Sequence, residues 1–292
     1  MSLIDRYAVI GSGIRYSRSP YLHARFAQAT GQAMEYGLID VPAEGFLATV
    51  QEFFAAGGRG LNITVPFKTA AVPLAAALTP RARRAAAVNT LAQGLGPGGG
   101  LLGDNTDGAG LVRDLAHNLG YRLQGARVLL LGAGGAARGV IAPLVAAGAS
   151  ELAVLNRDAA RARQLAAQFS DLGAVRALNP VDEAATAFAR AAAFDLVINA
   201  TSASLHGALP QVPAQAVGPH TLCYDLAYGA EDTVFVRWAR TAGAARAEMG
   251  LGMLVEQAAE AFYLWRGVRP ETAPVLAGLK AELAASRTGA AC

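Results

Sequence analysis

The fold is decided by the stretch Arg127-Val-Leu-Leu-Leu-Gly132-Ala-Gly-Gly-Ala-Ala137-Arg138. Its apolar first half predicts a short buried strand, and the glycines predict a tight turn into a helix over about 134–147. Gly132, Gly134 and Ala137 fit the G-x-G-x-x-G/A pattern, which brings a pyrophosphate close to the backbone at a helix N-terminus. Such glycine turns also occur for packing alone. In the context of a second strand, described next, the pattern predicts a doubly wound α/β fold that binds a dinucleotide.

The next predicted strand, 151–155, bears on which dinucleotide fits. Where a fold specific for NAD usually ends this strand in an acidic residue, this chain has Asn156 followed by Arg157. Arg157 and Arg161 lie one helical turn apart and could bind a 2′-phosphate, although they could also be simply solvated. Asp158 counts against a phosphate, but its expected role is to cap the helix 159–169. The sequence therefore favours NADP over NAD.

The composition excludes several classes of protein. The 292 residues, 53% apolar and 16% charged, are enough for two domains with their own cores. A net charge of +3 without a basic, aromatic-rich block argues against a nucleic-acid partner. No apolar run reaches the roughly 20 residues of a membrane helix, and 1–6 lacks the pattern of a secretion signal. We therefore expect a cytoplasmic protein without membrane contact. Cys223 and Cys292 match no metal spacing, and no metal is expected.

The first hundred residues alternate predicted strands and helices, which indicates an α/β domain of its own. Ser19 precedes Pro20 at a predicted helix start and is the expected N-cap, which leaves the hydroxyl of Ser17 freer. Holding a ligand is the alternative role for Ser19. His23, inside that helix, is expected to be a packed, hydrogen-bonded core residue rather than a catalyst.

Asn62 and Thr64 alternate along a predicted strand over 59–65 and therefore share one face of it. Pro66 is expected to begin a helix whose first turn contains Lys68. The helix dipole disfavours a cation at that end, so a functional role is favoured for Lys68.

Two carboxylates follow a predicted hairpin with a glycine-rich loop, formed by 87–91 and 101–104. Asp104 and Asp107 could serve acid–base chemistry, bind a metal or, in the case of Asp107, cap the helix 109–119. Because 110–112 offers no further ligands, a metal site is not expected.

Two later strands bring polar or small residues toward the predicted nucleotide-binding edge, and a long helix follows them. A strand over 194–199 ends in Asn199-Ala-Thr201-Ser202, and a strand over 221–228 delivers Tyr228, for which plain packing is the alternative. Gly250 then leads into a long helix, where the amide of Gln257 lies on an apolar face. Such an amide needs a partner, which could be a ligand or a backbone carbonyl.

Taken together, these stretches resemble the shikimate dehydrogenase family along essentially the whole chain. Several occur in the family's order and spacing, which makes the likeness specific. The matching stretches are Ser17-Arg-Ser-Pro20, Asn62-Ile-Thr-Val-Pro-Phe-Lys68, Val88-Asn-Thr-Leu91, Gly103-Asp-Asn-Thr-Asp-Gly108, Gly132-Ala-Gly-Gly-Ala136, Asn156-Arg157, Asn199-Ala-Thr-Ser202 and Gly250-Leu-Gly-Met-Leu-Val-Glu-Gln257.

The resemblance implies a two-domain enzyme that reduces 3-dehydroshikimate to shikimate with NADPH, on the route to chorismate and the aromatic amino acids. It implies an α/β substrate-binding domain over 1–106 and 251–292, to which the C-terminal helices return. A Rossmann-type, doubly wound NADP-binding domain would occupy 107–250. The partner is expected to be a small-molecule substrate, and the enzyme a monomer or homodimer.

The resemblance also assigns roles to residues by position. Lys68 and Asp107 would be the catalytic pair, and Ser17 and Ser19 would hold the substrate carboxylate. The residues expected around the ring hydroxyls are Asn62, Thr64, Asn89, Asp107, Tyr228 and Gln257. The residues expected to bind NADP are Gly132, Ala133, Gly134, Gly135, Ala136, Asn156, Arg157 and Arg161, with Thr201, Leu226 and Gly250 near the nicotinamide.

Some positions depart from the family pattern, and two other functions stay open. Ser12-Gly13-Ile14 stands where Asn-Pro-Ile is usual, Arg18 replaces a lysine, Met249 replaces a common acid, and Leu226-Ala227 replaces a bulkier pair. None of these changes touches Lys68 or Asp107. The alternatives are a quinate/shikimate dehydrogenase able to use NAD and quinate, and a non-catalytic module that senses NADPH.

Overall fold

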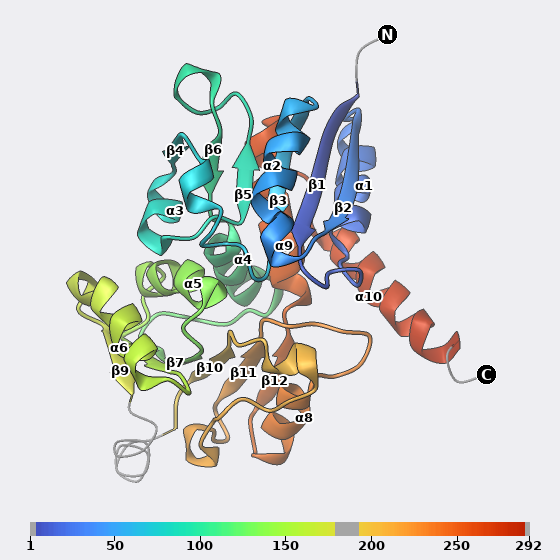
Figure 1. Cartoon of the computed structure of the whole chain (residues 1–292). Helices are drawn as coiled ribbons and strands as arrows, with labels where there is room; N and C mark the ends of the chain where they lie inside the picture. Colours follow the sequence, from blue (N-terminus) through green and yellow to red (C-terminus); the bar gives the residue numbers. More distant parts are fainter. Residues whose placement is uncertain (1–3, 179–192, 290–292) are drawn as a thin grey trace. The chain divides into compact units, whose positions relative to one another are not determined.

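The computed structural model describes residues 4–178 and 193–289, which form two compact units (Figure 1). The first unit comprises Met1–Gly110 and Leu254–Ala277, and the second comprises Leu111–Met253 and Gly278–Cys292. These limits lie a few residues from the domain boundaries expected at 106 and 251. The segment after Ala277 groups with the second unit rather than with the first, so that the limit falls inside the last helix, α10 (Ala273–Gly289).

The first unit is built on a mixed six-stranded sheet in the order β2-β1-β3-β5-β6-β4. Strand β1 is parallel to β2 and β3, whereas β5 is antiparallel to β3 and β6. The strands are β1 (Asp5–Gly11), β2 (Met34–Asp40), β3 (Gly58–Ile63), β4 (Ala77–Leu78), β5 (Thr90–Ala92) and β6 (Leu102–Asp104). The helices are α1 (Ser19–Thr30), α2 (Phe46–Ala55), α3 (Pro80–Ala85), the start of α4 (Asp107–Arg113) and most of α9 (Leu251–Arg266).

Both faces of this sheet are covered, which explains the nearly unbroken apolar run of β1. Ala8 and Ile10 pack in one core cluster with Phe46 and Val50 of α2. Tyr7, which points to the opposite face, packs against Trp265 of α9 with ring centroids 4.8 Å apart and ring planes tilted by 35°. Successive side chains of β1 point to opposite faces of the sheet, so they pack against α2 on one face and against α9 on the other.

The second unit is built on a fully parallel six-stranded sheet in the order β12-β11-β10-β7-β8-β9. The order reverses between β7 and β10, which is the switch point of a doubly wound fold. The predicted doubly wound α/β fold is thus confirmed. The strands are β7 (Arg127–Leu131), β8 (Glu151–Leu155), β9 (Val175–Leu178), β10 (Leu196–Asn199), β11 (Leu222–Asp225) and β12 (Arg246–Met249), and the helices include α5 (Gly135–Ala146), α6 (Ala159–Gln168) and α8 (Val234–Thr241).

Strand β7 lies at the centre of this sheet with its two faces in separate cores. Val128 and Leu130 belong to one buried cluster, while Leu129 and Leu131 belong to the other. The apolar run before Gly132 is therefore buried on both sides, as predicted. Within the described residues, no helix is both long enough and apolar enough to cross a membrane.

Candidate functional site

Lys68 and Asp107, 39 residues apart in sequence, form an ion pair in the first unit. The ammonium of Lys68 donates a hydrogen bond to Oδ2 of Asp107 at 2.5 Å. Only 13% of the lysine side chain and 5% of the aspartate side chain are exposed, so water screens the pair weakly. The structure thus brings together the two residues expected to be the catalytic pair.

The helix predicted to begin at Pro66 does not form. Lys68 lies in a turn, and its carbonyl accepts a hydrogen bond from the backbone of Val88 at 2.7 Å. A helix would need that carbonyl for a residue four positions later, so the long-range bond prevents the helix from extending. The helix-dipole argument for Lys68 was therefore wrong, and the interest of this lysine depends on its partner.

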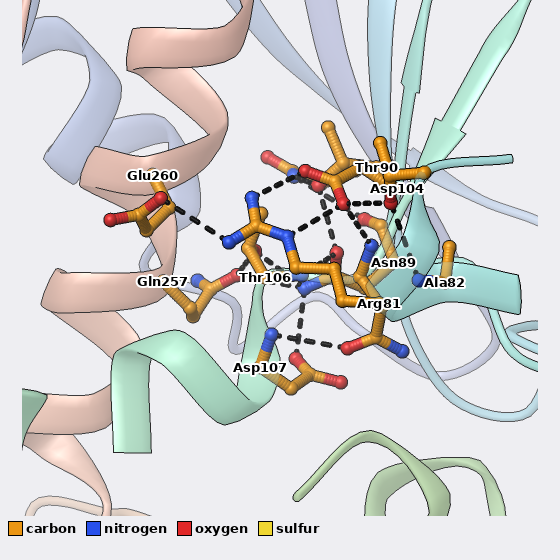
Figure 2. Close-up of polar contacts among 12 residues, drawn as sticks. Arg81, Ala82, Asn89, Thr90, Asp104, Thr106, Asp107, Gln257 and Glu260 are labelled. Atoms are coloured by element: carbon orange, nitrogen blue, oxygen red, sulfur yellow. Dashed lines mark hydrogen bonds and ion pairs between the residues drawn. The ribbon is translucent and has the colours of Figure 1, made fainter. Parts of the chain in front are cut away.

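Asp107 is the first residue of α4, and its carboxylate does not cap the helix. Its Oδ1 accepts a hydrogen bond from the amide of Asn89 at 2.9 Å (Figure 2). Its Oδ2 binds Lys68. Its backbone N–H donates to Oδ1 of Asn105 at 3.2 Å. Both carboxylate oxygens are thus directed by side chains, and each keeps a lone pair for a further donor.

Asn89 is the centre of the polar network around this pair. Its Oδ1 accepts from the N–H of Thr106 at 2.8 Å and from the hydroxyl of Thr90 at 2.9 Å. Its amide nitrogen lies 2.8 Å from the hydroxyl oxygen of Thr106 and 3.3 Å from Oε1 of Gln257. Gln257 in turn donates to the backbone carbonyl of Leu254 at 2.8 Å, which supplies the internal partner that its apolar surroundings require.

Arg81, on α3, is a residue that the sequence did not single out. Its guanidinium binds both carboxylate oxygens of the buried Asp104, at 2.7 and 2.5 Å, and reaches Glu260 of α9 at 3.4 Å (Figure 2). Burial raises the pKa of the Asp104 carboxyl, but the hydrogen bonds and charge of Arg81 outweigh it and keep the pKa below its ordinary value. Asp104, which Arg81 binds, is the last residue of β6 and lies two residues before Thr106. A buried aspartate needs a cation, but no local pattern in the sequence marks Arg81, 23 positions from Asp104, as that cation.

Ser17, Ser19, Tyr36 and Asn62 form a second polar cluster in the first unit. The predicted capping role of Ser19 is wrong, because Arg18 holds the N-cap position of α1 and no side chain caps it. The backbone N–H of Ser19 instead lies 3.3 Å from the hydroxyl oxygen of Ser17, which therefore is not the freer of the two. Asn62 lies at the end of β3 and accepts a hydrogen bond from the hydroxyl of Tyr36 at 2.6 Å.

His23 of α1 stacks on Tyr36, with ring centroids 4.1 Å apart and planes 5° from parallel. It is buried, as expected, but neither ring nitrogen has a hydrogen-bond partner of good geometry. Burial lowers the pKa of His23 to about 3, and the nearby Asn62 opposes this shift only weakly. His23 is therefore a neutral packing residue. Thr64, just after β3, is half-buried.

The glycine turn after β7 has the geometry of an anion site. Gly132 has φ +108°, and a Cβ there would lie 3.1 Å from the backbone of Ala200, so the position requires glycine. Gly134 is the N-cap of α5, where no side chain accepts the free N–H groups, and a Cβ at Gly134 would meet nothing within 4 Å. Open space thus faces the helix N-terminus formed by Gly135 and Ala136, next to Ala133, and a pyrophosphate fits such an arrangement.

Arginines gather after β8. Asp158 caps α6 as predicted, since its Oδ1 accepts from the N–H groups of Ala160 at 2.9 Å and Arg161 at 3.3 Å. Arg157 and Arg161 are exposed, while Asn156 donates to the carbonyl of Asp158 at 3.0 Å. Burial and the nearby charge of Arg161 lower the pKa of Arg138 on α5. Arg138 was not predicted to bind the cofactor, and it adds a cation to this cluster.

Thr201, Leu226 and Gly250 follow β10, β11 and β12, so they lie at one edge of the parallel sheet. Asp225 organises this edge by accepting hydrogen bonds from Asn199, Ser204, Thr233 and the backbone of Ala227. A Cβ at Gly250 would lie 2.7 Å from the carbonyl oxygen of Leu226, so only glycine fits there.

Tyr228 belongs to the second unit, in the loop after β11, and is half-buried. The other residues expected to contact the substrate lie in the first unit. Among the residues that the structure describes, no group of three histidine, cysteine or acidic side chains is arranged to hold a metal.

Comparison with known proteins identifies the family. Residues 9–91 match the family model of the shikimate dehydrogenase substrate binding domain, 114–223 that of shikimate / quinate 5-dehydrogenase, and 250–279 that of the shikimate 5′-dehydrogenase C-terminal domain. The shikimate dehydrogenase (NADP(+)) of Alkalilimnicola ehrlichii is 53% identical over 96% of this chain and 100% of that protein.

Two solved structures agree with this match. The Ael1 enzyme from Pseudomonas putida has a TM-score of 0.84 and 47% identity, over 94% of this chain and 98% of that one. The shikimate 5-dehydrogenase of Thermus thermophilus, solved in complex with NADP(H) and shikimate, has a TM-score of 0.79 and 32% identity, over 96% of this chain and 98% of that one. On these sequence matches along nearly its whole length, the chain belongs to the shikimate dehydrogenase family.

Proposed function

We propose that this chain catalyses the reversible, NADPH-dependent reduction of 3-dehydroshikimate to shikimate, a step toward chorismate and the aromatic amino acids. The observation that carries the proposal is the weakly screened Lys68–Asp107 ion pair, found in a chain of this family. The first unit would bind the substrate, and the second unit, with its glycine turn and arginine cluster, would bind NADP.

Reduction of a ketone produces an alkoxide, so the reaction needs a positive charge and a source of a proton at that oxygen. The ammonium of Lys68 offers both. It has three N–H donors, of which one binds Asp107. A lysine can release a proton to the product oxygen, whereas an arginine in this position would stay charged.

Asp107 would hold the ammonium of Lys68 at the ketone and accept a hydrogen bond from a ring hydroxyl through its remaining lone pairs. Asn89 fixes the plane of that carboxylate, because its amide donates to Oδ1 while Lys68 binds Oδ2. Ser17 and Ser19 would donate their hydroxyl protons to the substrate carboxylate. Thr64 and Gln257 of the same unit complete the proposed set around the ring, and a role for Tyr228 stays a prediction from the family resemblance.

The second unit fits NADP by its own chemistry. The N-terminus of α5 offers uncapped backbone N–H groups with open space at Gly134 for the pyrophosphate, and Arg157, Arg161 and Arg138 supply the charge for a 2′-phosphate. Asp158 does not oppose this, because its carboxylate is committed to the cap of α6. Bound NADPH would supply the hydride, and Thr201, Leu226 and Gly250 would border the nicotinamide.

The test is a set of parallel kinetic measurements on the purified chain, with shikimate or quinate and with NADP or NAD. We expect the highest kcat/KM for shikimate with NADP. A preference for quinate or for NAD would instead support the quinate/shikimate dehydrogenase, which the name of one matching family model includes. NADPH binding without turnover of either acid would support the sensing module.

A cytoplasmic location and a monomeric or homodimeric state are part of the same proposal. Cell fractionation and light scattering of the purified protein would test them.

A further inference from the structure

We propose that Tyr36 is a positioning residue for the carbonyl oxygen of Asn62, whose side chain faces the substrate as a pure hydrogen-bond acceptor, so that this position selects a hydroxyl group. The inference rests on the proposed function, since it assumes that Asn62 faces the ring of a hydroxylated acid. It adds a residue outside the expected site, and it specifies which chemical group Asn62 can recognise.

The orientation of the Asn62 amide follows from its neighbours. Its nitrogen lies 3.3 Å from the backbone carbonyl oxygen of Asn89, which can only accept a hydrogen bond. The same nitrogen lies 3.1 Å from the hydroxyl oxygen of Thr90, whose own proton is directed to the side-chain oxygen of Asn89 at 2.9 Å. Both acceptors require N–H groups from Asn62, so the flipped amide is excluded and both of its donors are occupied.

The carbonyl oxygen of Asn62 must then face Tyr36. Because that oxygen cannot donate, the phenol donates to it, at 2.6 Å. A carbonyl oxygen has two lone pairs, and one of them remains after this bond. With 6% of its surface exposed, Asn62 can therefore offer a ligand an acceptor and no donor. A substrate hydroxyl satisfies this acceptor, whereas a ketone or carboxylate oxygen would be repelled.

Tyr36 is itself held so that its proton stays on Asn62. Its ring is stacked flat on that of His23. Burial raises the pKa of the Tyr36 phenol, and the hydrogen bond with the Ser19 side chain opposes this shift. Since the phenol proton is used for Asn62, Ser19 is the donor in that bond. Tyr36 thus connects Ser19, proposed for the carboxylate, with Asn62, proposed for a ring hydroxyl.

The test compares Tyr36→Phe with wild type. The substitution keeps the ring that stacks on His23 and removes the hydroxyl, which leaves a buried carbonyl oxygen without its donor. We expect the KM for shikimate to rise about tenfold, while kcat and the KM for NADP change by less than about twofold. A general loss of structure would move all three constants together and lower the melting temperature.

Tyr7→Phe is the matched control. Tyr7 lies on β1 directly opposite Tyr36 in the strand register, and its hydroxyl faces Arg266 rather than Asn62. We expect Tyr7→Phe to keep the wild-type KM for shikimate. An unchanged KM in Tyr36→Phe, or an equal rise in both variants, would overturn the positioning role.

A second measurement needs no variant. Shikimate analogues in which one ring hydroxyl at a time is replaced by fluorine, which cannot donate a hydrogen bond, are compared on the wild-type enzyme. We expect at least one replacement to raise KM or the inhibition constant about tenfold, and Tyr36→Phe to reduce that discrimination. Equal binding of all analogues would refute the acceptor role of Asn62. Failure of the wild type to oxidise shikimate would instead refute the proposed function itself.

Discussion

At the scale of single residues, the chain's use of cations sets Lys68 apart. Of its 25 lysines and arginines, only Lys68 and Lys280 are lysines, and Lys280 is exposed. Arginine supplies the other ion pairs described here, including those of Asp104 and Glu260. A lysine in contact with a nearly buried aspartate is therefore an exception in this chain, and unlike arginine a lysine can give up a proton.

Lys68→Ala should lower kcat by roughly 10²- to 10⁴-fold, the usual contribution of a positioned acid–base group. The KM for shikimate should change less, because Ser17, Ser19 and the ring contacts remain. Steady-state rates with shikimate and NADP measure both constants. Lys280→Ala, which removes an exposed lysine, should behave like wild type, and a normal kcat in Lys68→Ala would remove this residue from the chemistry.

The sequence predicted which residues form the pair but not how they are held. Lys68 and Asp107 could be identified because their stretches resemble a known family. The surrounding contacts join residues far apart, such as Arg81 with Glu260, 179 positions away, and no local pattern signals them. The helix that was wrongly predicted at Lys68 has the same explanation. The backbone N–H of the distant Val88 donates to the carbonyl of Lys68, which a helix would have needed for its own hydrogen bond.

At the scale of elements, the turn from β8 into α6 separates two functions of neighbouring residues. Asp158 caps the helix, and Arg157 and Arg161 remain for a ligand. Short-range rules were reliable here because the capping partners lie two and three residues away, which local sequence specifies.

Arg161→Gln should raise the KM for NADP by about ten- to a hundredfold, the loss expected for one charge-assisted hydrogen bond to a phosphate. The KM for NAD should stay nearly constant, since NAD lacks the 2′-phosphate. Arg163→Gln on the same helix is the matched control, because side chains two positions apart point to different sides. If Arg161→Gln weakens NAD and NADP equally, the arginine does not select the phosphate.

The contact of α4 with α9 provides a second element-scale prediction. A Cβ at Gly110 would lie 2.6 Å from the backbone nitrogen of Gln257, so Gly110→Ala must displace α9. We expect a loss of about 1–3 kcal/mol in the free energy of unfolding and a higher KM for shikimate. Urea unfolding and kinetics measure these effects. Gly37→Ala, whose Cβ would meet Ala8 at an ordinary 3.8 Å, should change neither, and a neutral Gly110→Ala would show that the helices adjust freely.

At the scale of the whole molecule, the two sheets differ in how far sequence can predict them. The parallel sheet of the second unit alternates strands and helices with strongly apolar strands, so its order follows from general rules of handedness. The first sheet also contains β4, two residues long, which pairs with β6 through Ala77 and Leu78. So short a strand carries no periodic signal and is specified only by the strand beside it.

The stability of the molecule should depend on pH through His23. Burial lowers the pKa of His23 from 6.5 to about 3, so between these values the unfolded chain binds a proton that the folded chain does not. The free energy of unfolding must therefore fall as pH falls from 6.5, by about 1.4 kcal/mol per pH unit once the unfolded histidine is charged. Aspartates whose pKa is lowered, such as Asp104, change the free energy of unfolding only near and below pH 3.8. That range lies below the two pH values compared next.

Urea unfolding of wild type and His23→Phe at pH 6.5 and 5.0 isolates this effect. Wild type should lose about 2 kcal/mol between the two values, and the variant, which keeps an aromatic ring against Tyr36, should lose far less. The neighbours of His23 do not titrate in this window, because they are the rings of Phe26, Phe262, Trp265 and Tyr36 and the amide of Asn62, and burial raises the pKa of Tyr36. Equal losses in both proteins would mean that His23 accepts a proton in the folded state, and that the ring beside Tyr36 is then a charged imidazolium rather than a neutral packing group.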